Sequence, residues 1–443
     1  MIEMLRSEAT QRAQSGSFLL PDRSRISSLR LLGTALPVLY VWSLPVLAWC
    51  EFAHTCDGYP RCDATGMSVS NFIANARATG AMAACFFYPA LHLWQNAQYV
   101  RNHKYVYSTL VAFQVSFGIF LMCPITEVPE LHPPAVCLFC SAALTHCFVL
   151  LKHCADSRLW LCKSLVCAAL ASFAMVFILV TVASVDGELL KAHVPALFYT
   201  MECCGLSSMA IFPLFWYRAV TETHASQETG ANETSSFALI DHSDTSRLRF
   251  MGAALPVLYV WSLPLLAEAG FAHKCANYPR CDRTGMSVSN FIANAWATGA
   301  MAACFFYPAL YVWLNAEYVR HHRFVFPTLV VFQASFGIFI TCPVTELPNW
   351  HAPAVLLFCI AALVHYGLLM RYCTSNRLRL CQALVSIAIA AFMVVFTLMI
   401  IGHLDGNMLI DNVPVLFWMM ECCGLSSMAL LPVVWFRERQ LRG

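Results

Sequence analysis

The chain has 443 residues, of which 59% are hydrophobic and only 12% are charged, and its mean hydropathy is +0.62. Soluble domains carry about 25% charged residues, so this composition excludes the soluble class and predicts a membrane protein. The net charge of +2 and the lack of a dense basic cluster argue against a nucleic-acid partner.

Residues 1–30 are polar and lack the apolar core of a cleaved signal peptide, which predicts a cytosolic tail. Twelve apolar stretches of roughly 20 residues follow, each long enough to span a bilayer as a helix. In the first half they cover residues 31–50, 78–97, 105–123, 135–151, 162–184 and 195–217. In the second half they cover residues 250–268, 297–316, 324–342, 354–370, 381–403 and 414–436. Residues 219–246, between the halves, are polar and turn-rich, which predicts a flexible cytosolic linker.

The two halves are copies of one unit. The stretch Met67 to Leu91 returns at Met286 to Leu310 with one difference, Trp296 standing in place of Arg77. The offset of 219 positions holds without a gap from Gly33 to Trp216. We therefore predict two domains, 31–218 and 247–443, in a parallel repeat because six spans is an even number. Near-identity without gaps suggests that a single six-span unit can fold alone.

Lysine and arginine set the orientation. Of the 27 in the chain, 21 fall in the two tails and in the loops on one side of the predicted spans, which places both termini in the cytosol. The predicted fold is all-α, with twelve transmembrane helices arranged as two tandem parallel six-helix bundles. The predicted location is the endomembrane system (ER, Golgi or lysosome) or the plasma membrane, and the two bundles are candidates to pack together.

The longest segment outside the cytosol joins the first two spans. Cys56 and Cys62 lie in it, and a disulfide or two free thiols are both open there, as at Cys275 and Cys281. Polar residues follow at Asp63, Asn71 and Asn75, the last two spaced to share a face of a helix, and the second copy repeats them at Asp282, Asn290 and Asn294. The segment is either a site for a polar headgroup or a capped, structured loop.

Glu202 and Glu421 lie within the sixth span of each copy, in the shared sequence MECCGLSSMA. A carboxylate at membrane depth is costly and usually faces a bundle interior, a cavity or a partner. It could transfer a proton or bind a headgroup or cation. It could equally form a structural hydrogen bond to a neighbouring helix.

Histidines and further carboxylates lie near the same surface, at His132 and Glu127 and again at His351 and Glu346. They could bind a divalent metal or run acid–base chemistry, but no tight ligand spacing such as HExxH occurs, so no metal site is predicted. His146 and His365 lie deep in spans, where a buried hydrogen-bonding role is favoured. Paired axial haem ligands would need two histidines per site, so no cofactor is predicted.

These features resemble a six-span membrane family that contains the damage-regulated autophagy modulators, the post-GPI-attachment Golgi protein and the N-terminal domain of the fungal calcofluor-white-hypersensitive protein. The matching positions are a Pro-to-Gly stretch, an aromatic residue, a His opening the fourth span and a Cys/Glu-containing sixth span. Here they are Pro60 to Gly66, Phe72, His132 and Glu202, and in the second copy Pro279, Gly285, Phe291, His351 and Glu421.

The sequence departs from the family pattern in three ways. Asp63 is one place earlier relative to Pro60 than the family's usual acidic residue, no Pro-Pro-Glu run follows Gly66, and Pro133 replaces the acid that often follows the His. The doubled unit is not the family's common form either. The resemblance implies GPI-anchor lipid remodelling, control of lipid distribution or autophagy-linked regulation, with membrane lipids and GPI-anchored precursors as partners.

Three hypotheses follow. The leading one is a non-hydrolytic lipid-handling or lipid-remodelling factor, with no catalytic residue assigned, whose lumenal-side polar pocket is made by Asp63, Asn71, His132 and Glu202 and their copies. The second is a transporter of six plus six spans whose halves rock about a central site. The third is a structural or regulatory membrane protein without its own ligand.

Overall fold

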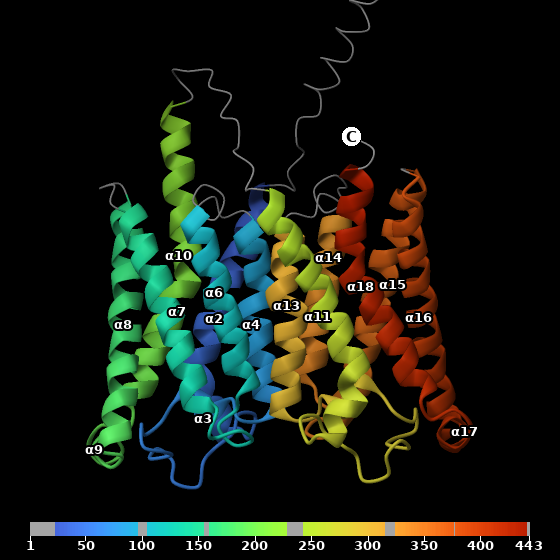
Figure 1. Ribbon diagram of the computed structural model, residues 1–443, viewed down its shortest axis with the longest axis horizontal. Helices are drawn as coiled ribbons and strands as arrows, with labels where there is room; N and C mark the ends of the chain where they lie inside the picture. The colour runs from blue at the N-terminus through green and yellow to red at the C-terminus, as the bar shows by residue number, and fades with distance from the viewer. Residues whose placement is uncertain are drawn as a thin grey trace, which may run out of the picture.

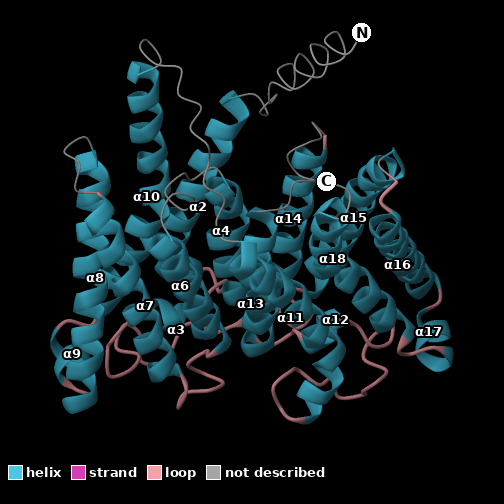
Figure 2. Cartoon of the chain, turned by 45° about the horizontal axis from the view of Figure 1, so that its top comes forward, coloured by secondary structure: helices cyan, strands magenta, loops and turns pink. Residues whose placement is uncertain are grey.

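The computed structural model describes residues 23–95, 104–154, 159–227, 242–314, 324–375 and 377–440. Throughout this part of the chain the regular elements are helices, apart from two isolated bridges, Asp63 with Gly66 and Asp282 with Gly285 (Figure 2). Nine of the described helices are long and apolar enough to cross a membrane. The protein is therefore a helical, polytopic integral membrane protein.

Each half contributes six long helices. In the first half these are α2 (Arg23–Trp49), α4 (Ala76–Gln95), α6 (Lys104–Met122), α7 (His132–His153), α8 (Trp160–Val185) and α10 (Leu197–Gln227). In the second half they are α11 (His242–Glu268), α13 (Ala295–Leu314), α14 (Val325–Thr341), α15 (Pro348–Ser375), α16 (Arg379–Leu404) and α18 (Leu416–Gln440). Short helices join them: α3 (Val69–Phe72), α9 (Leu189–His193), α12 (Val288–Phe291) and α17 (Gly406–Asn412).

Each predicted span overlaps one of these helices, although residues 96–97 and 315–316 of the predicted spans lie outside the described residues. Several helices continue into sequence predicted as tail or linker. Helix α2 begins at Arg23, inside the predicted tail, and α10 and α11 extend to Gln227 and from His242, inside the predicted linker. Residues 1–22 of the tail and 228–241 of the linker lie outside the described residues. The polar composition that marks the ends of an apolar run does not by itself end a helix, which can extend into water.

The connecting segments with α3, α9 and α17 lie together at one end of the molecule (Figure 1). The start of α2, the ends of α10 and α18, and the start of α11 lie at the opposite end (Figure 1). Every polar side chain that the sequence singles out as a headgroup-site candidate is in or beside the first of these two ends. It is called the loop end below.

Aromatic rings fill the centre of each half. In the first half Phe113, Phe117, Phe120, Phe139 and Phe173 pack against one another, with ring centroids 5.3 to 5.6 Å apart between α6 and α7 and 5.6 Å from Phe139 to Phe173 on α8. Tilted, stacked and edge-on ring pairs such as these add to the free energy of burial. The second half repeats the cluster around Phe358.

The two halves meet through α4, α6, α13 and α14. The backbone of α4 packs closely against α2 of its own half and against α13 and α14 of the other half, and α6 packs against α13. Within the first half, α4 and α6 instead meet through the larger rings of Phe86, Phe87 and Phe117. Two glycines allow the close approach, since a Cβ on Gly80 would overlap the carbonyl of Ile340 and one on Gly299 that of Leu121.

Candidate functional site

The loop-end segment of each copy is hydrogen-bonded to the start of the sixth long helix. Gly66 has a φ of +83°, and a Cβ there would meet the backbone of Pro195. The next residue, Met67, donates its N–H to the Pro195 carbonyl at 2.7 Å and accepts the Tyr199 N–H at 3.1 Å. A glycine is required because its φ lies in the left-handed region and its hydrogen faces another backbone. These hydrogen bonds hold α3 against the start of α10.

A capping box then starts α3. The Ser68 hydroxyl accepts the Asn71 N–H at 3.1 Å, and the Asn71 Oδ1 accepts the Ser68 N–H at 2.8 Å. The free Nδ2 of Asn71 donates to Asp63 Oδ2 at 2.9 Å, while Asp63 Oδ1 accepts from the N–H and hydroxyl of Thr65. The Ser68 hydroxyl and one amide hydrogen of Asn71 are therefore donated inside this group. The segment is thus capped and structured, and it also places acidic oxygens beside α10.

Glu202, on α10, lies next to the first residue of α3. It is only 7% exposed, and its Oε2 accepts the Val69 N–H at 2.7 Å, at the first residue of α3. Across the described chain no group donates to its Oε1, and that atom is not fully enclosed by protein. A buried carboxylate with one free oxygen is costly unless something else supplies a donor.

His132 opens α7 next to this group. Its Nδ1 lies 2.5 Å from the Cys123 carbonyl, which can only accept, so Nδ1 carries the proton and Nε2 of the neutral ring is an acceptor. His132 is 7% exposed, and Asp63 is near enough to both His132 and Glu202 to interact with them electrostatically. The four predicted pocket residues Asp63, Asn71, His132 and Glu202 are thus brought into one neighbourhood, which we call the acceptor cluster.

The second copy builds the same acceptor cluster from Asp282, Asn290, His351 and Glu421. Val288 donates its N–H to Glu421 Oε2 at 2.6 Å, and Asn290 Nδ2 donates to Asp282 Oδ2 at 2.9 Å. His351 Nδ1 lies 2.6 Å from the Cys342 carbonyl. The molecule therefore holds two equivalent clusters.

Asn75 and Asn294 do not join the clusters. They precede α4 and α13, where their Oδ1 atoms accept the N–H groups of Ala78 at 3.0 Å and Ala297 at 3.2 Å. The expectation that Asn71 and Asn75 share a helix face is wrong, because α3 ends at Phe72 and Asn75 caps the next helix. Spacing by four residues indicates a shared face only when one helix is continuous.

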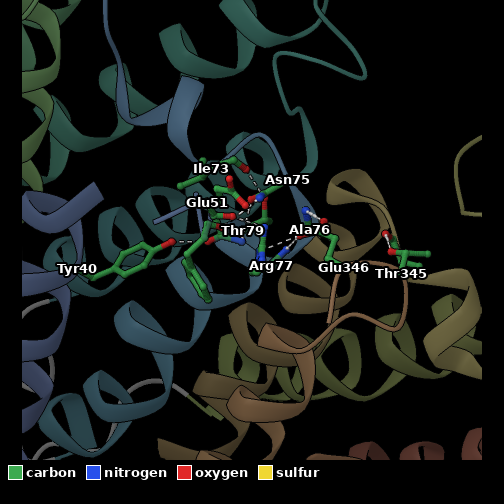
Figure 3. Close-up of polar contacts among 12 residues, drawn as sticks. Tyr40, Glu51, Ile73, Asn75, Ala76, Arg77, Thr79, Thr345 and Glu346 are labelled. Carbon is green, nitrogen blue, oxygen red and sulfur yellow. Dashed lines mark hydrogen bonds and ion pairs between the residues drawn. The ribbon is translucent and has the colours of Figure 1, made fainter. Parts of the chain in front are cut away.

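Glu127 and Glu346 do not join the cluster of their own copy either, because each reaches across to the other half. Glu346 accepts the N–H groups of Ala76 at 2.8 Å and Arg77 at 3.4 Å, at the start of α4 (Figure 3). Glu127 accepts those of Ala295 at 2.8 Å and Trp296 at 3.1 Å, at the start of α13. A carboxylate at a helix N-terminus satisfies exposed N–H groups and complements the helix dipole.

The preceding threonines are residues that the sequence interpretation missed. Thr126 donates its hydroxyl to Ala74 O at 3.1 Å in its own copy, and Thr345 donates to Ala293 O at 3.0 Å. In each Thr-Glu dipeptide the threonine is therefore hydrogen-bonded within its own copy, and the glutamate is hydrogen-bonded to the other copy. The signal in the sequence is a Thr-Glu pair recurring in both Pro-rich loops.

The one difference between the repeated 25-residue stretches lies at this contact. Arg77 forms an ion pair with Glu346 at 3.2 Å and lies over the Phe52 ring at 5.4 Å, whereas Trp296 packs on Phe271 at 5.1 Å. In the described chain no Lys or Arg pairs with Glu127. Desolvation raises the pKa of Glu127, the nearby charge of Glu346 adds to the rise, and the N–H groups of Trp296 and Ala295 oppose it.

The cysteines and the deep histidines have structural partners. Cys56 is bonded to Cys62 and Cys275 to Cys281, closing the two predicted cysteine loops. His146 is fully buried, with Nδ1 2.9 Å from the Thr109 hydroxyl, and His365 repeats the contact with Thr328 at 3.0 Å. Over the described residues no three His, Cys, Asp or Glu side chains gather as a metal site would need.

Replacing Asn71 with alanine should destabilise the loop end, because it removes the acceptor of two Ser68 groups and the donor to Asp63. Leaving buried polar groups unsatisfied costs about 1 to 3 kcal/mol. We expect a clear fall in the thermal unfolding midpoint of the detergent-solubilised protein. The matched control is Asn412→Ala, whose exposed side chain donates only to Met408 O. Equal midpoints for the two variants would contradict this role.

Comparison with known proteins gives no match for this chain among protein-family models, curated proteins or solved structures. The family resemblance carried by the short motifs therefore stays a prediction.

Proposed function

We propose that the protein is a twelve-span membrane protein with both termini in the cytosol, and that each half engages a lipid headgroup at its acceptor cluster on the lumenal side. The helices that fall short of span length or hydropathy over their described residues, α4, α13 and α14, pack against helices that qualify as spans. The excess of Lys and Arg at the opposite end supports this orientation.

One observation carries the headgroup proposal: the cluster holds acceptor atoms that no donor of the described chain satisfies. The hydroxyl of Ser68, one amide hydrogen of Asn71 and the Nδ1 hydrogen of His132 are donated within the protein, whereas Glu202 Oε1 and His132 Nε2 receive no donor from the described chain. These two acceptors would take their donors from a ligand. A group that satisfies such atoms brings its own hydrogens, as a hydroxyl or an ammonium does. A bare phosphate does not fit, since Asp63 and Glu202 would repel it.

The substrate class is therefore a lipid whose headgroup carries hydroxyl or amine groups, which includes the glycan of a GPI anchor. The role we propose is binding and presentation of that lipid without hydrolysis. A transporter whose halves rock against each other is less well supported, because the halves are interlocked by helix caps and by glycines against carbonyls at the loop end.

The test is mass spectrometry of GPI-anchor lipids in cells that lack their own remodelling factor. Cells expressing the wild-type chain should recover the mature anchor lipids, and cells expressing the Glu202→Gln, Glu421→Gln double variant should not. Glutamine keeps the size of the side chain but replaces a free carboxylate oxygen with an amide that donates.

The matched control is Glu438→Gln, which changes a carboxylate in the last turns of α18, far from the cluster, where it accepts from Leu380 and Cys381. An unchanged anchor profile with folded wild-type protein in the correct compartment would remove the GPI proposal. Recovery by the double variant at wild-type level would remove the acceptor cluster as its site.

A further inference from the structure

The interface between the halves is isologous: each contact occurs twice, with the partners exchanged. Glu346 caps Ala76 and Glu127 caps Ala295, and these pairs are the same two positions taken in opposite order. Gly80 lies against Ile340 as Gly299 lies against Leu121. Two identical subunits related by a two-fold axis make contacts of this kind.

Each half is also incomplete at this surface when taken alone. Asn75 serves the N–H of Ala78, and neither α4 nor α13 has an acidic residue in its first turn. The N–H groups of Ala76 and Arg77 find their acceptor only in Glu346 of the other half. An unpaired half would leave these N–H groups to water alone and would lose the favourable interaction between the carboxylate and the helix dipole.

We propose that the surface formed by the first turns of α4, the last turn of α6 and residues 124–131 is a pairing surface. Its partner is a second six-helix unit of the same kind, and the pairing does not need the linker. The Thr-Glu dipeptide determines the register, because Thr126 holds Ala74 of its own unit while Glu127 reaches Ala295 of the partner.

The test uses the full chain with a protease site inserted within residues 228–241 and an affinity tag at the N-terminus. After solubilisation in a mild detergent and cleavage, the fraction of second half retained with the tagged first half is measured over a dilution series. We expect the cleaved wild-type halves to stay together. The Glu127→Gln, Glu346→Gln double variant should release more of the second half, with the ratio of free to paired halves rising roughly fivefold for each weakened cap.

The matched control is Glu438→Gln, which alters a carboxylate cap contained within the second half. Separation of wild-type halves on cleavage would overturn the proposal, as would equal release by the Glu438→Gln variant. A further arm mixes two cleaved preparations whose first halves carry different tags. Recovery of one tag with the other shows pairing of like units, and its absence after full exchange would overturn the claim that a unit of the same kind is the partner. None of these readouts depends on lipid binding.

Discussion

Replacing Gly285 with alanine should cost far more stability than the same change at Gly270. Both glycines have left-handed φ values, +85° and +82°, so both substitutions carry a conformational cost of roughly 1 to 2 kcal/mol. A methyl on Gly270 meets nothing within 4 Å, whereas one on Gly285 would overlap the backbone of Pro414. The overlap adds roughly 1 to 3 kcal/mol, because Met286 is hydrogen-bonded to that same carbonyl at 2.6 Å and cannot move away freely.

The measurement is the thermal unfolding midpoint of each purified variant in one detergent. The Gly285→Ala variant should also loosen the acceptor cluster of the second copy, since α12 follows directly. Rates of proteolysis at the loop end would report that loosening. Equal midpoints for Gly285→Ala and Gly270→Ala would show that the close contact of Gly285 with Pro414 adds nothing to the cost of its left-handed φ.

The second large effect is expected at Gly299, where alanine should force the halves apart. In an open helix position, Gly→Ala stabilises by about 1 kcal/mol because alanine is the better helix former. Gly367 on α15 is such a position, with nothing within 4 Å of an added methyl. At Gly299 the methyl would overlap the Leu121 carbonyl, which belongs to a helix backbone in the other half. We expect a net loss of roughly 1 to 3 kcal/mol there.

The measurement is the thermal unfolding midpoint of the Gly299→Ala and Gly367→Ala variants. We expect the midpoint of Gly299→Ala to be the lower of the two. The Gly80→Ala variant should behave as Gly299→Ala does, because its methyl would meet Ile340 in the mirrored contact. A Gly299→Ala variant as stable as Gly367→Ala would mean that the halves can separate at α4 and α13 without cost.

Nine of the long helices could be predicted from the sequence because each contains an apolar run of bilayer length. The expected span 162–184 corresponds to α8 (Trp160–Val185), and 381–403 to α16 (Arg379–Leu404). The order of the spans determines on which side of the membrane each connecting segment lies. It could therefore also be predicted that Asp63, His132 and Glu202 lie near the same membrane surface. Hydrogen-bond partners could not, because they depend on the turn at Gly66 and on where α3 stops.

The role of Glu127 and Glu346 was beyond reach of the sequence for a different reason. A carboxylate beside His132 in a short loop is close in sequence to its own cluster, and nothing local says that it points to another half. That direction is set by the packing of α4 against α13 and α14, which is a contact between repeats. Near-identical repeats hide such contacts, because residues within a copy and between copies have the same sequence context.

The position of four helix ends has a consequence for how a gene for such a protein can be rearranged. The start of α2, the end of α18 and the two helix ends that flank residues 228–241 all lie on one side of the molecule (Figure 1). Joining the end of α18 to the start of α2 and opening the chain between α10 and α11 would put the second unit first without moving a helix. Because the contacts between the units are symmetric, the order in which they are encoded is free, and duplication followed by fusion could have joined them in either sequence.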